Sequence, residues 1–127
     1  MTPLSEHFTV EEFYDSDTAR AKNIDNIPPP GIVQNLHKLA ASLEKVREVL
    51  GHPVKINSGF RCLKLNLAIG GAKSSSHMTG CAADIVCPGF GTPKQVMDAI
   101  LKSGIRFHRM IYERTWVHFD IPYESAN

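Results

Sequence analysis

The sequence predicts an α+β fold, a single domain over residues 1–127 with a small, mostly antiparallel sheet and helices packed on one side. Three observations predict it. A chain of 127 residues has the commonest size of a single domain and can bury one core. Apolar residues recur at helical spacing between residues 32 and 50. Residues 54–57 and 116–121 instead alternate between apolar and polar side chains, as short strands do.

The composition excludes several classes of protein. Hydrophobic residues make up 43% of the chain and charged residues 21%, which is typical of a folded soluble domain. A net charge of +1 argues against a nucleic-acid surface and gives no electrostatic preference for an anionic cell wall. The chain shows no apolar run near the ~20 residues of a membrane span and no signal-peptide pattern. We therefore expect a monomer made in the cytoplasm, with no nucleic-acid partner and no membrane span.

The N-terminal part predicts a short helix followed by a loop. Thr9 and Glu12 form a T-x-x-E capping box, a signal for a helix start. The helix that follows carries Val10 and Phe13 toward the core. Residues 15–30 are polar and then rich in proline, so we expect a loop there.

The middle of the chain predicts the longest helix and the first strand. The apolar stripe over residues 32–50 indicates a core helix of about 18 residues, and Gly51 supplies its end. Residues 54–57 are expected to form a strand, and residues 63–68 a short helix. The segment 73–79 is rich in serine and is expected to be irregular, as loops that carry functional residues often are.

The C-terminal third predicts a buried strand, a helix and a hairpin. Residues 82–87 are apolar except for Asp84, and some are small, which indicates a buried strand. A second capping box over residues 92–95, with proline at the first helical position, starts a helix that Gly104 ends. Residues 107–113 and 116–121 are expected to pair across a two-residue turn.

The three cysteines, Cys62, Cys81 and Cys87, are odd in number, so at least one stays unpaired. Free thiols in a reducing compartment are the favoured interpretation. A Cys62–Cys81 bridge remains open as an alternative.

Two motifs carry residues with metal-binding chemistry. Residues 75–84 read S-x-H-x-x-G-x-A-x-D, and W-x-H follows near the C-terminus. His77, Asp84 and His118 together supply two imidazoles and a carboxylate, the ligand set of a catalytic Zn²⁺ that leaves a fourth position for water. Gly80 lets the backbone turn between the first histidine and the aspartate. An isolated His-x₆-Asp pair is usually coincidence, so the hypothesis depends on both motifs together.

These motifs resemble the zinc D-Ala-D-Ala carboxypeptidase family of peptidoglycan peptidases, which shares its fold with hedgehog signalling domains. The resemblance covers roughly residues 5–121 and is strongest in Ser58-Gly59-Phe60-Arg61, Asn66, Gly70-Gly71, the block from His77 to Asp84, and Trp116-Val117-His118. It implies the hedgehog/DD-peptidase fold, a Zn²⁺ cofactor and a peptidoglycan stem peptide as substrate. The small size and the lack of a signal or wall-binding module are similar to a phage or prophage protein delivered by other means.

The hairpin supplies a candidate general base. If the turn has two residues, Glu113 lies opposite Trp116 and is the diagonal neighbour of His118, roughly 7–8 Å away. A carboxylate there can reach a metal-bound water without being a ligand. A turn longer by one residue would remove Glu113 from this face.

The base is also where the chain departs from better-known members of the family. Many of them place the catalytic carboxylate three residues before the last histidine, and that position is Thr115 here. Threonine cannot serve as the base. Glu113 is therefore the candidate, with His108 and Asp120 open as alternatives.

The resemblance also implies roles for residues that touch the substrate. Arg61 matches the arginine that binds the scissile carbonyl or its developing oxyanion, and a planar, permanently charged donor suits that role. Ser75 matches a serine that hydrogen-bonds substrate, with stabilisation of its own loop as the alternative. Trp116 shares the polar face of its strand with His118 and is expected to line the substrate cleft.

The chain is thus predicted to be a zinc-dependent peptidase that hydrolyses peptidoglycan stem peptides, of the D-Ala-D-Ala carboxypeptidase or L-Ala-D-Glu/DD-endopeptidase type. It would act on the cell wall after release or delivery from the cytoplasm. One alternative is a phage tail or structural module that keeps the fold, binds wall and cuts little or not at all. Another is a hedgehog-like interaction domain with a structural zinc.

Overall fold

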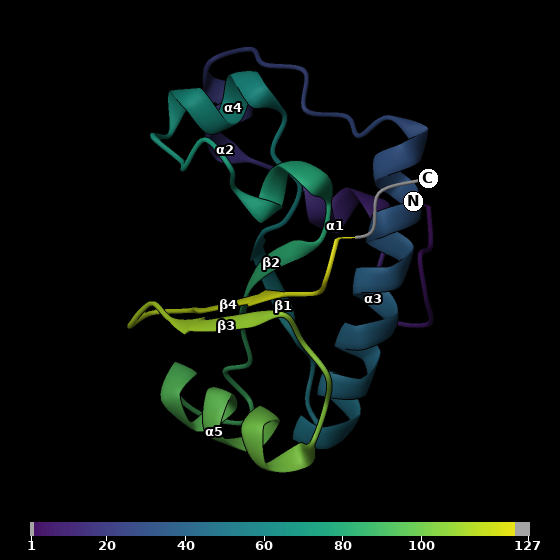
Figure 1. The fold of residues 1–127 in the computed structure, drawn as a ribbon, viewed down its shortest axis with the longest axis vertical. Coiled ribbons are helices and arrows are strands. Elements are labelled where there is room, and N and C mark those ends of the chain that lie inside the picture. Colours follow the sequence, from purple (N-terminus) through teal and green to yellow (C-terminus); the bar gives the residue numbers. More distant parts are fainter. Residues whose placement is uncertain (1, 124–127) are drawn as a thin grey trace.

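The computed structural model of the chain describes residues 2–123 and contains a four-stranded antiparallel sheet with the strand order β1-β2-β4-β3 (Figure 1). Its helices are α1 (Val10–Tyr14), α2 (Asp17–Ala21), α3 (Pro30–Leu50), α4 (Leu63–Ala68), the 3₁₀-helix η1 (Ser76–Thr79) and α5 (Pro93–Ser103). Its strands are β1 (Lys55–Ser58), β2 (Ala82–Val86), β3 (Arg109–Tyr112) and β4 (Val117–Asp120). The predicted α+β fold class is confirmed.

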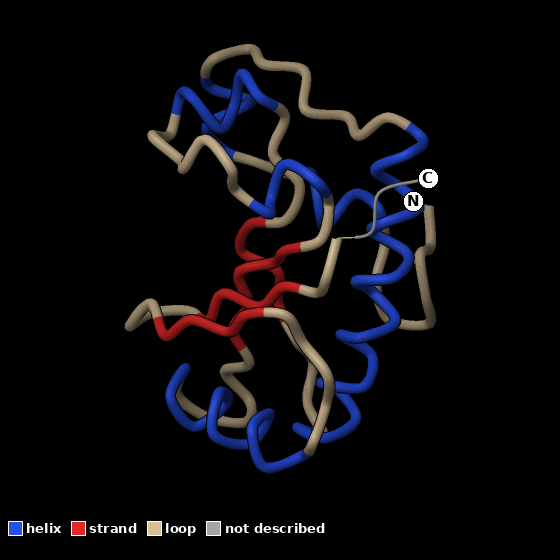
Figure 2. Tube along the Cα trace, in the orientation of Figure 1, coloured by secondary structure: helices blue, strands red, loops and turns tan. Residues whose placement is uncertain are grey.

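The hydrophobic core lies between the sheet and its helices. Helix α3 runs along one side of the molecule, and α5 lies below strands β3 and β4 in this view (Figures 1 and 2). The middle of the apolar stripe of α3 is completely buried: Leu36, Leu39, Ala40, Leu43 and Val46. Val117 and Phe119 of β4 join this core. Because side chains alternate along a strand, His118 and Asp120 are left on the opposite face of the sheet.

Most helix boundaries follow the predicted capping signals. Both capping boxes form, with the Thr9 hydroxyl accepting from the Glu12 amide and the Thr92 hydroxyl from the Gln95 amide. Gly51 ends α3 with φ +70°, in the left-handed conformation that glycine adopts without strain. These sequence predictions are confirmed.

The loop predicted over residues 15–30 is wrong in part, because α2 lies within it. The Ser16 hydroxyl accepts a hydrogen bond from the Ala19 amide and so caps the helix, and Arg20 pairs with Asp15 and Asp17. Five residues are too few to show a helical period in the sequence. Helix α3 is also longer than expected, with 21 residues, because it begins at Pro30.

The hairpin has the predicted two-residue turn. The amide of Glu113 donates to the Trp116 carbonyl at 3.0 Å, and the register pairs Tyr112 with Val117 and Ile111 with His118. Arg114 has φ +66°, which fits such a turn. Glu113 therefore lies diagonally across from His118, as the sequence predicted.

Two further expectations concern the whole chain. The three cysteines are free thiols, so the alternative Cys62–Cys81 bridge is wrong. Among the helices of residues 2–123, none combines the length and the apolar character needed to cross a membrane.

Candidate metal centre

The register of the central strands brings two candidate ligands together. Asp84 of β2 pairs directly with His118 of β4, so the two side chains leave the sheet on the same face. His77 enters the site from η1, which is separated from β2 by two residues, Gly80 and Cys81. Gly80 makes that entry possible because it has φ +80° and lies against α3, where an added Cβ would approach the Ile32 side chain to 2.9 Å.

The three side chains offer ligand atoms that converge on one point. His77 Nε2 lies 3.2 Å from Asp84 Oδ1, and His118 Nδ1 lies 3.3 Å from the same oxygen. One ligand atom from each residue lies within 4.8 Å of the other two. In a tetrahedral zinc site with bonds of about 2.0–2.1 Å, neighbouring ligand atoms are roughly 3.3 Å apart. The donor set and the two nitrogen–oxygen distances therefore fit Zn²⁺.

Hydrogen bonds on the far side of each ring select which nitrogen is free to bind. His77 Nδ1 lies 2.7 Å from the Gly59 carbonyl, which can only accept, so Nδ1 donates there and Nε2 is the nitrogen that faces Asp84 and could bind a metal. His118 Nε2 lies 2.7 Å from Asp120 Oδ2, so in this ring Nδ1 is the free nitrogen. Partners of this kind orient metal-binding histidines and strengthen them as ligands.

Asp120 therefore holds a candidate ligand in place, a contact that argues against it as the general base. The side chain is fully buried and also accepts hydrogen bonds from Ser76 Oγ and from Nε of Arg109. His108, the other alternative, has a half-exposed side chain bonded to Asp120 Oδ1 and does not line the cleft described below. The H-x-D spacing on one strand face was the sequence signal for the bond between Asp120 and His118.

The electrostatics of the metal-free site follow from these contacts. Burial alone would raise the pKa of Asp84, but hydrogen bonds from His118 and His77 outweigh it and lower that pKa to about 2. Burial would lower the pKa of His118, but the hydrogen bonds to Asp120 and Asp84 raise it to about 9. The pKa of Asp120 falls to about 2, because the bonds from His118 and Ser76 outweigh burial. A zinc ion must therefore displace a proton from His118, and its binding strengthens as pH rises.

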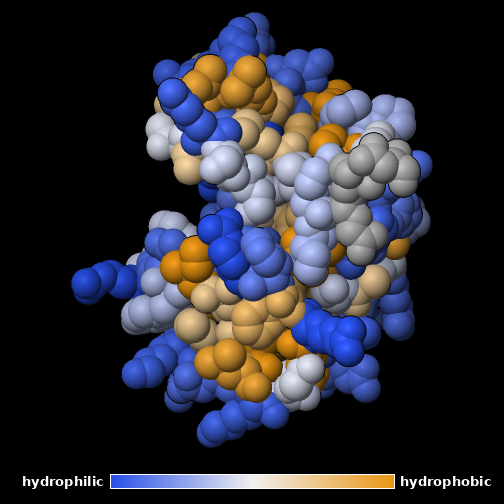
Figure 3. Space-filling model, in the orientation of Figure 1, coloured by the Kyte–Doolittle hydropathy of each residue, from blue (hydrophilic) through white to orange (hydrophobic). Residues whose placement is uncertain are grey.

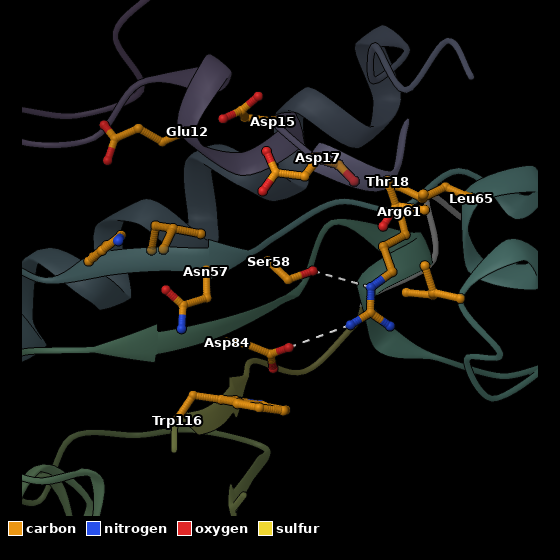
Figure 4. Close-up of a pocket in the computed structure, with 14 residues that line it drawn as sticks. Glu12, Asp15, Asp17, Thr18, Asn57, Ser58, Arg61, Leu65, Asp84 and Trp116 are labelled. Atoms are coloured by element: carbon orange, nitrogen blue, oxygen red, sulfur yellow. Dashed lines mark hydrogen bonds and ion pairs between the residues drawn. The ribbon is translucent and has the colours of Figure 1, made fainter. Parts of the chain in front are cut away.

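An open cavity of about 780 Å³ lies beside this group and has Asp84 in its wall. Figure 3 shows the hollow between the surface formed by α4 and that formed by the β3–β4 hairpin. In the close-up, Asn57, Ser58, Asp84 and Trp116 lie along one side, and Glu12, Asp15 and Asp17 lie along the other (Figure 4). The volume suits a peptide-sized ligand.

Arg61 closes one end of the cleft, with its guanidinium pointing toward the metal-binding group (Figure 4). Its Nη2 lies 3.5 Å from Asp84 Oδ2, the oxygen that faces away from the histidines. Nε donates to Ser58 Oγ at 3.2 Å, and Nη1 lies 3.5 Å from Asn66 Oδ1. Burial lowers the pKa of Arg61, and the neighbouring Asp84 opposes that effect.

The remaining predicted site residues differ in whether they line the cleft. Trp116 lines the cleft. Ser75 caps η1, its hydroxyl accepting from the His77 amide at 3.2 Å, and it is not among the residues that line the cavity. Glu113 is exposed at the hairpin turn, on the face of His118 but outside the cavity lining.

Comparisons with known proteins point to one family. The model of the family described as Peptidase M15 matches residues 6–120, which is most of the chain. Among curated proteins, the chain is similar to a zinc D-Ala-D-Ala carboxypeptidase of Streptomyces albus G, with 43% identity over 44 residues. That match covers 34% of this chain and only 17% of the relative.

Proposed function

Because the chain belongs to the Peptidase M15 family, we propose that it is a zinc-dependent peptidase that hydrolyses peptidoglycan stem peptides. The observation that carries the proposal is the convergence of His77, Asp84 and His118 beside a cleft that also holds Arg61. The curated relative is named for the same metal and for a D-Ala-D-Ala bond.

In this proposal His77 Nε2, His118 Nδ1 and a carboxylate oxygen of Asp84 hold the metal. When bound, zinc lowers the pKa of a water molecule toward ~7 and polarises a carbonyl oxygen. The residues around the site orient the ligand atoms of these three side chains for the metal. The Gly59 carbonyl and Asp120 fix the two rings, and Asp84 divides its two oxygens between the histidines and Arg61.

Glu113 is the proposed general base. The other acidic side chains near the cleft already have hydrogen-bond or ion-pair partners, which supports this choice. Glu12 uses its carboxylate to cap α1, accepting from the Thr9 amide at 2.9 Å. Asp15 and Asp17 both pair with Arg20. Among the residues that the structure describes, Glu113 has no ion-pair partner, and it lies one diagonal step from His118. Its carboxylate can take a proton from water and return it to the leaving amine.

Arg61 and Trp116 are the proposed substrate contacts within the cleft. The Arg61 guanidinium bonds the scissile carbonyl oxygen and the negative charge that develops on it. Trp116 offers a flat apolar surface to the peptide from the hairpin side. Ser75 is proposed to add a hydrogen bond to the substrate beyond the cap that it forms on η1.

Digestion of purified muropeptides, with the fragments weighed by mass spectrometry, tests the proposal directly. We expect zinc-loaded protein to release fragments, and their masses to distinguish a D-Ala-D-Ala cut from an L-Ala-D-Glu or cross-bridge cut. The His77→Ala variant is the matched control and should release none. Wall fragments that bind and stay intact would contradict the proposal and favour the binding module.

Arg61→Lys tests whether this residue acts in the transition state. Lysine keeps the charge but loses the planar fork, so turnover should fall while the Michaelis constant changes little. The loss of one such donor typically costs about 3 kcal/mol of transition-state stabilisation. A rise in the Michaelis constant at constant turnover would instead assign Arg61 to a substrate carboxylate.

A further inference from the structure

Asn26, in the connector between α2 and α3, holds the backbone on both sides of Arg61. Its side chain is buried, with 5% of the residue exposed. The amide nitrogen donates to the Phe60 carbonyl at 3.0 Å, and the amide oxygen accepts from the Cys62 amide at 2.8 Å. The same nitrogen donates its second hydrogen to the Tyr14 carbonyl at 2.9 Å. One side chain thus joins the N-terminal segment to the residues before and after Arg61.

The opposite side of this short segment contacts a candidate metal ligand. The Arg61 amide donates to the His77 carbonyl at 3.2 Å, and the Gly59 carbonyl accepts from His77 Nδ1. Phe60 is held in turn, because its amide donates to the Phe13 carbonyl. Gly59 leaves no room for a side chain, since an added Cβ would lie 2.5 Å from that same carbonyl oxygen. The backbone of Arg61 therefore lies between Asn26 and His77.

The guanidinium itself is held less closely than the backbone. Two of its three polar contacts, those to Asn66 and Asp84, measure 3.5 Å, at the long end of hydrogen bonding. These contacts leave the guanidinium able to shift toward a substrate oxygen. The position from which it reaches the metal group is then set by the backbone, which Asn26 bonds on both sides of Arg61.

We propose that Asn26 is a positioning residue for Arg61, which it aims at the reacting carbonyl from outside the cleft. The inference rests on the proposed function, in which Arg61 touches that carbonyl. An asparagine suits the position because it supplies two N–H donors and an acceptor in one short group. Aspartate keeps the acceptor for Cys62 but turns a carboxylate toward the carbonyls of Tyr14 and Phe60.

A double-mutant cycle tests the proposal with a synthetic stem pentapeptide that begins with L-Ala-D-Glu and ends in D-Ala-D-Ala. In Asn26→Ala and Asn26→Asp we expect turnover to fall on the order of 10- to 100-fold, since a displacement of about 1 Å is enough for such a loss. Zinc content and the Michaelis constant should stay near wild type. In an Arg61→Ala background the same substitutions should lower turnover less than about twofold, because the residue they position is gone.

Val96→Ala is the control for a loss of stability alone. Val96 is completely buried on α5 and is not part of the cleft lining, so its truncation should lower the melting temperature and leave turnover unchanged. If the fold-losses in turnover of the Asn26 and Arg61 single variants simply multiply in the double variant, the role of Asn26 is overturned. The same holds if turnover merely follows the melting temperature across the variants. Failure of both Asn26 variants to fold would also overturn it, by making the residue structural.

The proposed function can fail separately. If the wild-type protein cuts no bond of the pentapeptide, the proposed function is wrong; if it cuts but Arg61→Ala matches its turnover, the assignment of Arg61 is wrong. If Arg61→Ala is impaired while Asn26→Asp turns over at the wild-type rate, only the positioning role is wrong.

Discussion

The β3–β4 hairpin holds its functional side chains more firmly at its inner end, which is strand β4, than at its outer end, which is the turn between the two strands. At the inner end, His118 and Asp120 are 8% and 0% exposed; His118 contacts Asp84 of β2, and Asp120 accepts a hydrogen bond from Ser76 of η1. At the outer end, the turn presents Glu113 to solvent with no ion-pair partner in the described part of the chain. The two ends belong to one hairpin and are joined by a few residues.

The difference matches the chemistry proposed for each end. A metal ligand must keep one position, so burial and a fixed ring orientation favour it. A general base must serve both the attacking water and the leaving amine, and an exposed carboxylate can move between them. Rigidity at the inner end and freedom at the outer end therefore belong to one mechanism.

Removal of either histidine ligand of the proposed metal site, His77 of η1 or His118 at the inner end of the hairpin, should have the largest effect. His77→Ala and His118→Ala are expected to lose the single zinc, because two remaining ligands rarely hold the ion against a chelator. Elemental analysis after dialysis measures this. His52→Ala, which removes an exposed histidine, should keep its zinc. Undiminished zinc in both ligand variants would contradict the metal site.

At the outer end, Glu113→Gln should separate chemistry from metal binding. We expect zinc and fold to be retained while turnover falls by a factor on the order of 10²–10⁴. Glu48→Gln, an exposed substitution on α3, is the matched control. Near-normal turnover would mean that Glu113 is not the general base, and loss of the metal would mean that it is a ligand.

A subtler change at the inner end is Asp120→Asn. The substitution weakens the charge-assisted bond to His118 Nε2, and zinc affinity should fall about 10- to 100-fold. Competition with a chromophoric chelator measures the affinity. Asp98→Asn on α5 makes the same change of charge at an exposed site and should have no effect. An unchanged affinity in Asp120→Asn would mean that the ring of His118 needs no such partner.

The smallest expected effect is on the pH dependence of the metal-free protein. The pKa of His118 is raised from 6.5 to about 9, so its contribution to stability is complete below pH 6.5 and is lost as pH rises through 9. The pKa values of Asp84 and Asp120 are lowered from 3.8 to about 2, so their contributions are lost as pH falls through 2. The melting temperature, followed by circular dichroism, should therefore decline between pH 6.5 and 9.

Zinc should abolish that alkaline decline, because a nitrogen that binds the metal has no proton to lose. A decline of equal size in zinc-loaded protein would assign the pH dependence to groups outside the site.

Several features could be predicted from the sequence because they depend on neighbours along the chain. The capping boxes at Thr9 and Thr92 and the stop at Gly51 form between residues a few positions apart. The long apolar stripe identified α3, and strand alternation put His118 and Asp120 on one face. Helix α2 was not predicted because its five residues are too few to show a helical pattern in the sequence.

The tertiary structure decided what each polar residue does. The sequence placed Asp120 near the site, but only the packed sheet shows that its carboxylate is buried and bonded to His118. Nothing local to Asn26 indicates a contact with residues 34 and more positions away. Short-range patterns determine where helices and strands begin and end, whereas a hydrogen-bond partner distant in the sequence is chosen only when packing brings it within about 3 Å.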